Sequence, residues 1–461
     1  MKTIVPLLAI AVSAATFSLT GCGLAPDATT SAAPVITPSH GVALSGSVHG
    51  AQQPVSGSAV YLFAAGTTGY NGPSTSLLAG VSTDANGNGY VLSDSNGNFT
   101  ITSDYTCPSA ATPVYVAAVG GNPGLGAGKS NPNLAMMTAL GPCANLTSST
   151  FVFVNEVTTV AAVWALAPFM LDVADVSTSP GNSTGLANAF AAAGELANTT
   201  TGNFAGTTLP AGAVLPVSKM NTLADILAAC INTAGGVAGD ASACGNLFTA
   251  ATRSSSTPTN TISAALNVAR SPVTNAVSLF TLSSSTAPFQ PTLTVAPTDW
   301  TLAVQYTAGG FSNPKAIAID AQGNAWIANC GSANCTTTGA GSVVELSPLG
   351  APVATAFTAG GINIPVSIAI DSSGNAWIAN RGGNSVTELS SAGTAIAPAY
   401  TVGGLNAPSA ISIDGLGNAW VSNAGNSSVT ELSTTGTALS PGGGYSGSSV
   451  SAPVAIATTP H

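Results

Sequence analysis

The hydrophobic pattern of the chain changes twice along its length. From residue 41 to about 121, short apolar runs alternate with polar positions and are separated by Gly, Pro and Asn, as in "GSAVYLFAAG" and "TPVYVAAVGG". Such alternation predicts β-strands with one buried face. Between about 152 and 285 the apolar residues recur every three or four positions, which predicts helices. After residue 301 short strands return in a repeating order.

The first helical stretch carries one acid that needs an explanation. "VFVNEVTTVAAVWALAPFM" predicts a single long buried helix. Its length would suit a membrane span, but Asn155, Glu156, Thr158 and Thr159 within it favour a core helix. Glu156 is either a buried acid with a raised pKa, and so a candidate site, or an acid at a helix N-terminus that interacts with the helix dipole. Three later segments predict amphipathic helices: "TGLANAFAAAGELANTT", "MNTLADILAACINTAGG" and "NTISAALNVARSP".

A repeat follows a Pro-rich hinge. The copies read "NPKAIAIDAQGNAWIAN", "IPVSIAIDSSGNAWIAN" and "APSAISIDGLGNAWVSN", each followed by "SVVELS" or "SVTELS". The prolines that open successive units are 51, 43 and 45 residues apart: Pro314, Pro365, Pro408 and Pro453. A period near 43 with four short strands per unit predicts β-propeller blades. Because the chain supplies about three blades, we expect either two chains in a six-bladed ring, completion by another subunit, or a truncated reading frame.

The repeated phrase Pro-x-x-Ile-Ala-Ile-Asp-x-x-Gly-Asn-x-Trp-Ile-x-Asn resembles the NHL-repeat family and its streptogramin-lyase-like and gluconolactonase-like relatives. This resemblance covers residues 301–461 and implies a propeller fold. The related lyases use a His base and a Glu-bound divalent cation, but residues 301–460 contain no His and His461 belongs to no motif. The lactonase relatives hold a divalent metal with Glu, Asn and Asp. A metal-dependent lyase or lactonase is therefore the alternative function, and a divalent cation belongs to that alternative alone.

The phrases "QPVSGSAVYLF" and "SDSNGNFTI" resemble the carboxypeptidase-regulatory or transthyretin-like β-sandwich family. The resemblance implies a structural or adhesive module. Within it, Asp94, Asn96 and Asn98 imitate the first half of a calcium loop, but Tyr105 occupies the place of the bidentate acid and strands flank the segment. A turn is therefore favoured over a calcium site.

The acids of the repeat pose the question of scaffold or site. Asp320, Asp371 and Asp414 recur at equivalent places, and so do Glu345, Glu388 and Glu431. Because one substrate is bound once, a catalytic set breaks repeat symmetry, so we interpret the repeated acids as turn chemistry and the repeated Trp residues as packing. No catalytic residue and no metal ligand is predicted. The candidate ligand contacts are Arg381, Asn329, Asn380 and Asn423.

The N-terminus predicts export. Lys2, an apolar stretch from Ile4 to Phe17 and "LTGC" resemble a bacterial lipobox, which implies cleavage before Cys22 and a diacylglycerol on its thiol. Gly23 after the cysteine favours the outer membrane in that resemblance, and the alternative is an ordinary secretory signal with a free Cys22. In an oxidising compartment the other six cysteines would pair sequentially as Cys107–Cys143, Cys230–Cys244 and Cys330–Cys335.

Composition narrows the function classes. Only 5% of residues are charged and the net charge is −10, with seven scattered basic residues. Nucleic-acid binding and binding to anionic membranes through a basic patch are therefore not expected.

Together these features predict a multidomain chain with an all-β sandwich, a small α-helical domain and a partial NHL-like β-propeller. The expected parts are a signal peptide (1–21), a flexible tether (22–40), the β-sandwich (41–122), a connector (123–150), the helical domain (151–288), a linker (289–300) and the propeller repeats (301–461). We expect a non-catalytic binding scaffold without a cofactor, held in the outer membrane or at the cell surface by its lipid. Its partner would be an unknown protein or glycan, and self-association would complete the propeller.

Overall fold

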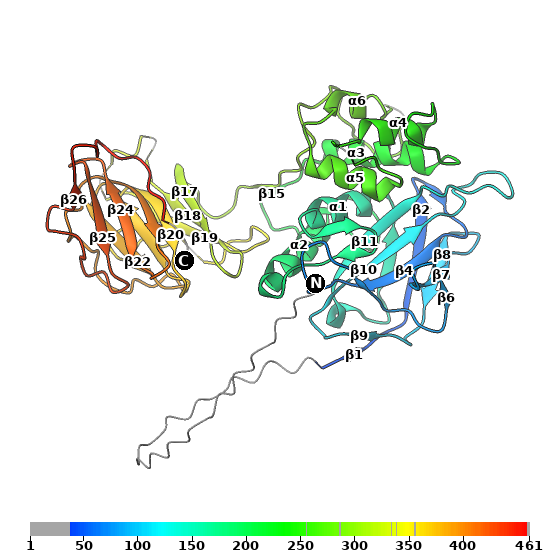
Figure 1. Ribbon diagram of the computed structural model, residues 1–461, viewed down its shortest axis with the longest axis horizontal. Coiled ribbons are helices and arrows are strands. Elements are labelled where there is room, and N and C mark those ends of the chain that lie inside the picture. Colours follow the sequence, from blue (N-terminus) through cyan, green and yellow to red (C-terminus); the bar gives the residue numbers. More distant parts are fainter. Residues whose placement is uncertain are drawn as a thin grey trace, which may run out of the picture. The chain divides into compact units, whose positions relative to one another are not determined.

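The computed structural model describes residues 37–458 except 255, 285–286, 333, 338 and 355. The expected signal peptide, Cys22 and most of the tether lie outside the described residues, as does His461. The described chain is mostly β, with a group of helices in its middle (Figure 1). Among the described residues no helix has both the length and the apolar character needed to cross a bilayer.

Two sheets form the N-terminal part. The first has the order β11-β10-β4-β7-β6 with β5 beside β4, and the second has the order β12-β2-β3 with β8 beside β2. The first sheet contains β4 Ala59–Ala64, β5 Thr75–Ser76, β6 Ser82–Thr83, β7 Gly89–Leu92, β10 Pro113–Val119 and β11 Ala135–Pro142. The second contains β2 Leu44–Gly50, β3 Gln53–Pro54, β8 Asn98–Ile101 and β12 Phe151–Val154. A short pair, β1 Ser39–His40 with β9 Thr106–Cys107, begins inside the range expected for the tether.

The structure differs from the expected single helix over residues 151–170. Phe151–Val154 forms β12, which pairs in parallel with β2, and α1 begins only at Glu156. The cause is local, because β-branched and aromatic residues favour a strand and Asn155 is a strong helix cap. The Asn155 side chain accepts the Thr158 N–H while the Thr158 hydroxyl accepts the Asn155 N–H, which is a capping box.

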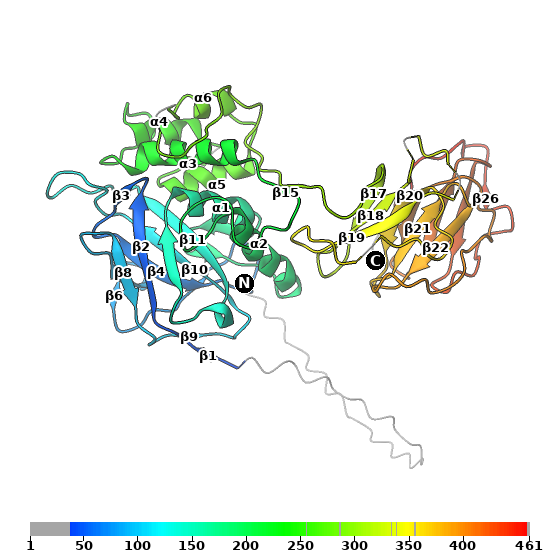
Figure 2. The same ribbon diagram turned by 180° about the vertical axis from the view of Figure 1, so that it is seen from behind.

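The helices share a core with the two sheets. They are α1 Glu156–Leu166, α2 Ser183–Leu196, α3 Val217–Ile231, α4 Ala243–Ala250, α5 Thr261–Arg270 and α6 Ala276–Phe280. Helix α1 lies at the centre, packed on β11, α2, α3 and α5 (Figures 1 and 2). One apolar cluster runs from Leu44 on β2 to Trp300, so the core is continuous across residue 151, where the sequence suggested a domain boundary. A short hairpin, β13 Met170–Asp172 with β14 Asp175–Val176, follows α1.

The disulfides join the pairs expected from the sequence. Cys107–Cys143 links β9 to the turn after β11, and Cys230–Cys244 links α3 to α4. The third bond, Cys330–Cys335, closes a short loop after β18.

The repeats form three antiparallel sheets of the same design. Sheet 1 contains β17 Pro314–Ile319, β18 Ala325–Asn329 and β19 Ser342–Leu346. Sheet 2 contains β20 Pro365–Ile370, β21 Ala376–Asn380 and β22 Ser385–Leu389. Sheet 3 contains β23 Pro408–Ile413, β24 Ala419–Asn423, β25 Ser428–Leu432 and β26 Tyr445–Ser446. Bridges from Phe357 and Tyr400 extend sheets 1 and 2 outward as β26 extends sheet 3.

The first strands of neighbouring sheets lie next to one another, β17 beside β20 and β20 beside β23. The register is the same in each sheet, with Ile317 opposite Ile327, Ile368 opposite Ile378 and Ile411 opposite Val421. The arrangement is propeller-like (Figure 2). The segment before sheet 1 contains β16 Gln305–Tyr306, which pairs with β15 Ala213–Val214.

Candidate functional site

The repeated Asp is fully occupied by hydrogen bonds within its own turn. In sheet 1, Asp320 Oδ1 accepts the N–H groups of Gln322 and Asn324 at 2.9 and 2.8 Å. Its Oδ2 accepts the Asn324 side-chain amide at 3.0 Å and the Trp326 indole N–H at 3.1 Å. Gly323 takes a φ of +89°, which suits glycine at this turn position. This carboxylate therefore has donors at both oxygens.

The same geometry recurs in the other two sheets. Asp371 accepts the Trp377 indole at 3.0 Å, and Asp414 accepts the Trp420 indole at 2.9 Å. The backbone donors repeat as well, two residues and four residues after each Asp. This supports the interpretation of the motif as scaffold, because three symmetric copies serve one structural purpose.

The same turn also occurs outside the repeats, at Asp84 and at Asp94, where the sequence favoured a turn. Asp84 accepts the N–H groups of Asn86 and Asn88, and Asp94 accepts those of Asn96 and Asn98 at 2.8 Å each. The carboxylate that resembled a calcium ligand therefore closes a turn. Among the described residues no group of three His, Cys, Asp or Glu side chains is placed to hold a metal ion.

The repeated Glu shows one break in symmetry. Tyr400 donates its hydroxyl to Glu388 Oε2 at 2.7 Å, and Tyr445 donates to Glu431 Oε2 at 2.9 Å. At the equivalent place beside Glu345 stands Phe357, which has no hydroxyl to donate. Burial raises the pKa of Glu345, and the nearby Asp320 raises it further.

The three candidate asparagines are buried at the ends of the middle strands. Asn329, Asn380 and Asn423 are 0% exposed. Asn380 donates to Thr387 Oγ1 at 2.9 Å and accepts the Asn363 N–H at 3.2 Å, and Asn423 makes the equivalent pair of bonds. These amides hold the loop of the preceding segment.

Arg381 is the exposed member of the candidate set. It directly follows β21, at the place that Cys330 and Ala424 take in the other repeats. Its backbone N–H donates to the Ile364 carbonyl at 3.1 Å, while the Ile364 N–H donates to the Ala340 carbonyl at 2.8 Å. The segment around Ile364 thus brings Arg381 and the disulfide-containing loop after β18 to one place, where the three repeats differ most.

Glu156, which the sequence singled out, is an extreme case of burial. It is 0% exposed, and the Ala51 N–H donates to both of its carboxylate oxygens at 2.8 and 2.9 Å. Burial raises its pKa to about 8, against the opposing effect of the Ala51 hydrogen bond. Glu156 is therefore a buried acid with a raised pKa, and as the first residue of α1 it is also an acid at a helix N-terminus.

Two further buried acids were not predicted. Glu195 on α2 and Asp225 on α3 are each 2% exposed, and burial raises the pKa of each to about 7. The Phe289 N–H donates to Asp225 Oδ1 at 3.1 Å, but Asp225 Oδ2 and Glu195 Oε1 have no hydrogen-bond partner among the described residues. The sequence feature that could have revealed these buried acids is an acid inside an apolar helical run, as in "TLADILAA".

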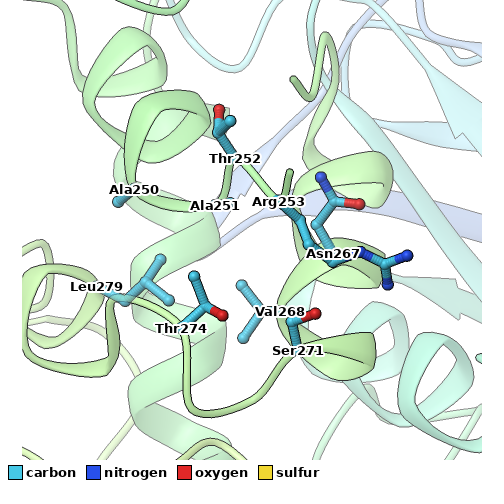
Figure 3. A pocket seen from close by; sticks show the side chains of 9 residues that line it. All are labelled: Ala250, Ala251, Thr252, Arg253, Asn267, Val268, Ser271, Thr274 and Leu279. Carbon is cyan, nitrogen blue, oxygen red and sulfur yellow. The ribbon is translucent and has the colours of Figure 1, made fainter. Parts of the chain in front are cut away.

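Two hollows in the helical part differ in the room that they offer. A cavity of about 320 Å³ is lined by residues of several segments, including Asn203, Phe204, Asn221 and Phe289. Figure 3 shows another hollow, between α4, α5 and α6, into which Val268, Thr274 and Leu279 point. That hollow leaves no volume that a water-sized sphere can enter.

Comparisons with protein-family models and with curated proteins found no match. Among solved structures the chain is similar to virginiamycin B lyase from Staphylococcus aureus, at 14% identity over 31% of this chain and 45% of that chain, with a TM-score of 0.25. A streptogramin B lyase matches at 18% identity over 30% and 43% of the two chains, with a TM-score of 0.24.

A putative gluconolactonase matches at 19% identity over 30% of this chain and 51% of that chain, with a TM-score of 0.25. The matched part therefore spans about half the length of these proteins or less. At this level of similarity no residue role transfers to this chain.

Proposed function

We propose that this chain is a lipid-anchored bacterial surface protein that acts as a non-catalytic binding scaffold. In this proposal an N-terminal β-sandwich with its helices carries a partial NHL-like propeller of about three blades. The observation that carries the proposal is the identical use of Asp320, Asp371 and Asp414, whose oxygens are all occupied by donors of their own turns.

The binding surface in this proposal is the place where the repeats differ. Arg381 and the Cys330–Cys335 loop meet there through the segment around Ile364. An exposed guanidinium binds carboxylates in a two-pronged geometry. A carboxylate carried by a glycan or a peptide is therefore the group that Arg381 would bind in this proposal.

Binding can be tested with an acidic polysaccharide such as alginate, with neutral dextran as the comparison. We expect alginate binding that weakens about tenfold in Arg381→Ala, on the scale of one lost charged hydrogen bond. Lys129→Ala, which removes an exposed cation from the N-terminal part, is the matched control and should bind as the wild type does. Equal binding by wild type and Arg381→Ala would remove the proposed role of this surface.

The anchor is a separate test. Mass spectrometry of the N-terminal peptide should find a diacylglyceryl group on Cys22, and Cys22→Ser should release the protein from the membrane fraction. A free thiol at position 22 in membrane-purified protein would contradict the anchor.

The alternative, a metal-dependent lyase or lactonase, predicts a different result. Equilibrium dialysis against Mg²⁺, Ca²⁺, Mn²⁺ and Zn²⁺ should show no stoichiometric binding if the repeats are scaffold. One bound ion per chain that Asn380→Ala or Asn423→Ala removes, together with turnover of a lactone, would favour the alternative over our proposal.

A further inference from the structure

The contact between neighbouring repeat sheets is built twice from the same residues. Trp326, Ala328 and Val343 of sheet 1 share an apolar cluster with Ile362 and Ile368 of sheet 2. In the next contact their equivalents are Trp377, Ala379 and Val386 of sheet 2 with Leu405 and Ile411 of sheet 3. Each sheet thus has a leading face, which carries the isoleucines of its first strand, and a trailing face, which carries the Trp and Val of its middle strands.

The leading face of sheet 1 is uncovered at its first strand, whereas Ile327 and Leu346 on the same face are buried with Tyr306 and Phe311 packed against them. Ile317 is 62% exposed, whereas its equivalents Ile368 and Ile411 are each 6% exposed. Ile319 on the same strand is 59% exposed, while its equivalents in sheets 2 and 3 are partly buried. Large exposed apolar neighbours of this kind mark an interaction surface.

The trailing face of sheet 3 is only partly covered. Trp326, Trp377, Val343 and Val386 are fully buried, but the corresponding Trp420 and Val429 are partly exposed. What lies beside sheet 3 is the segment 453–458, where Ser409 Oγ donates to the Pro453 carbonyl and Thr458 Oγ1 donates to the Ile413 carbonyl.

That segment follows the path of a first strand. Ala452 before Pro453 has a φ of +39°, as Ile364 and Ala407 have values of +49° and +43° before Pro365 and Pro408. Yet it forms no strand, and Val454 within it is 78% exposed. The segment therefore occupies the position of a neighbouring sheet without supplying one.

We propose that a second copy of this chain covers both faces. The leading face of one copy, Ile317 and Ile319, packs on the trailing face of the other copy, Trp420 and Val429, and displaces residues 453–458. The second copy is the fitting occupant because the contact would repeat one that this chain already makes twice, and because each chain carries one of each face. Two copies related by a two-fold axis satisfy all four faces and place six sheets in one ring, within the range of known propellers.

This inference rests on the propeller-like arrangement in the proposed function, and it is independent of the lipid anchor and of any ligand. Its test is the mass in solution of the full chain carrying Cys22→Ser, so that no lipid contributes to association. We expect light scattering at micromolar concentration to give twice the mass of one chain. A monomer over the whole concentration range, or a mass that keeps growing with concentration, would overturn the closed pair.

Two variants test whether the leading face and the trailing face take part in the dimer contact. Ile317→Asp places a charge on the leading face, and Val429→Asp places one on the trailing face, and each should weaken the dimer at least about tenfold. Leu416→Asp is the matched control, since Leu416 is a 74% exposed apolar residue in a turn of sheet 3 that lies on neither face, and it should stay dimeric. Circular dichroism melting checks that each variant is folded.

Mixing the two variants distinguishes a head-to-tail contact from any other. One Ile317→Asp chain and one Val429→Asp chain together retain one intact leading face and one intact trailing face, so the mixture should regain a dimer. A mixture that stays monomeric, or an Ile317→Asp variant with the wild-type mass, would contradict the proposed contact. A wild-type dimer that fails to bind alginate would instead count against the proposed function alone.

Discussion

Two buried aspartates show how differently this chain treats an acid in its two regions. Asp320 in the repeats is 9% exposed and receives four donors, whereas Asp225 in the helical region is 2% exposed and receives one. Burial raises the pKa of Asp225 to about 7. At the repeat-equivalent Asp414, burial also acts to raise the pKa, but hydrogen bonds led by the Trp420 indole bring it below its ordinary value. Asp225 thus combines deep burial with one donor, whereas Asp414 is less buried and accepts several hydrogen bonds, and both differences favour a higher pKa for Asp225.

The largest effect that follows is a pH dependence of the helical region. Glu156, Glu195 and Asp225 have folded pKa values of about 8, 7 and 7, above ordinary values of 4.5, 4.5 and 3.8. At a pH between its ordinary pKa and its folded pKa, each carboxyl group is ionised in the unfolded chain but still protonated in the folded chain. The unfolding free energy therefore falls as the pH rises from about 5 to about 8. The loss is at most about 1.4 kcal/mol per group and pH unit, which amounts to several kcal/mol in total.

Amide hydrogen exchange, corrected for the intrinsic rate at each pH, can measure this separately for peptides of α1 and of β21. We expect the protection of α1 to fall from pH 5 to pH 8 by more than that of β21, since burial also raises the pKa of Glu388, which lies opposite Trp377 of β21. Protection of α1 that rises over this range would contradict the assigned protonation states.

The second expected effect is a loss of stability when a carboxylate whose oxygens each accept two hydrogen bonds is replaced. Asp320→Asn keeps the size of the side chain but replaces an acceptor oxygen by an NH₂ group, which faces the Trp326 indole N–H or the turn amides. Because Trp326 is fully buried, the unpaired donor is costly, and we expect a loss of about 3 kcal/mol in the unfolding free energy of the repeats. Urea unfolding followed by tryptophan fluorescence measures it, with the exposed Asp104→Asn as the control. A loss equal to that of the control would mean that the indole bond contributes nothing.

The third expected effect is a gain, not a loss, in the unfolding free energy. Glu156→Gln neutralises an acid that is already protonated in the folded state below pH 8, and the amide oxygen can still accept the Ala51 N–H. We expect little change at pH 5 and a gain of about 2 kcal/mol at pH 8, where the wild-type unfolded chain ionises freely. Thermal unfolding at the two pH values checks this. An equal loss at both would show that Glu156 acts as a carboxylate rather than as a neutral acid.

The repeats could be predicted from the sequence because three copies reveal which residues are periodic. Asp320 and Trp326 have equivalents at fixed spacings, and turn chemistry explains them without tertiary information. The strand at Phe151–Val154 could not be separated from the helix that follows it, because an unbroken apolar run suits both. Its pairing partner is β2, about a hundred residues earlier, and such a contact leaves no mark in the local pattern.

The candidate site, too, could be predicted from the sequence only in part. The exposed place of Arg381 follows from its position after a strand, where the repeats differ. The burial of Asn380 and Asn423 depends on the segment that crosses each strand end, and the missing partners of Asp225 and Glu195 depend on how three helices pack. These are properties of the assembled core, and no single segment contains them.

The smallest expected effect comes from replacing an Asp whose turn has no Trp indole beside it. Asp94 makes the same backbone bonds as Asp320 but is exposed and has no indole beside it. Its pKa is lowered by the Asn98 and Asn96 hydrogen bonds, so its contribution is present above its ordinary value of 3.8 and is lost as the pH falls through the folded pKa. Asp94→Asn retains an oxygen that can accept both N–H groups, and we expect the unfolding midpoint at pH 7 to shift by no more than about 2 °C. Scanning calorimetry of Asp94→Asn beside Asp320→Asn makes the comparison directly. Equal shifts in the two variants would mean that the turn alone, without the buried indole, accounts for the stability that the repeats gain from this motif.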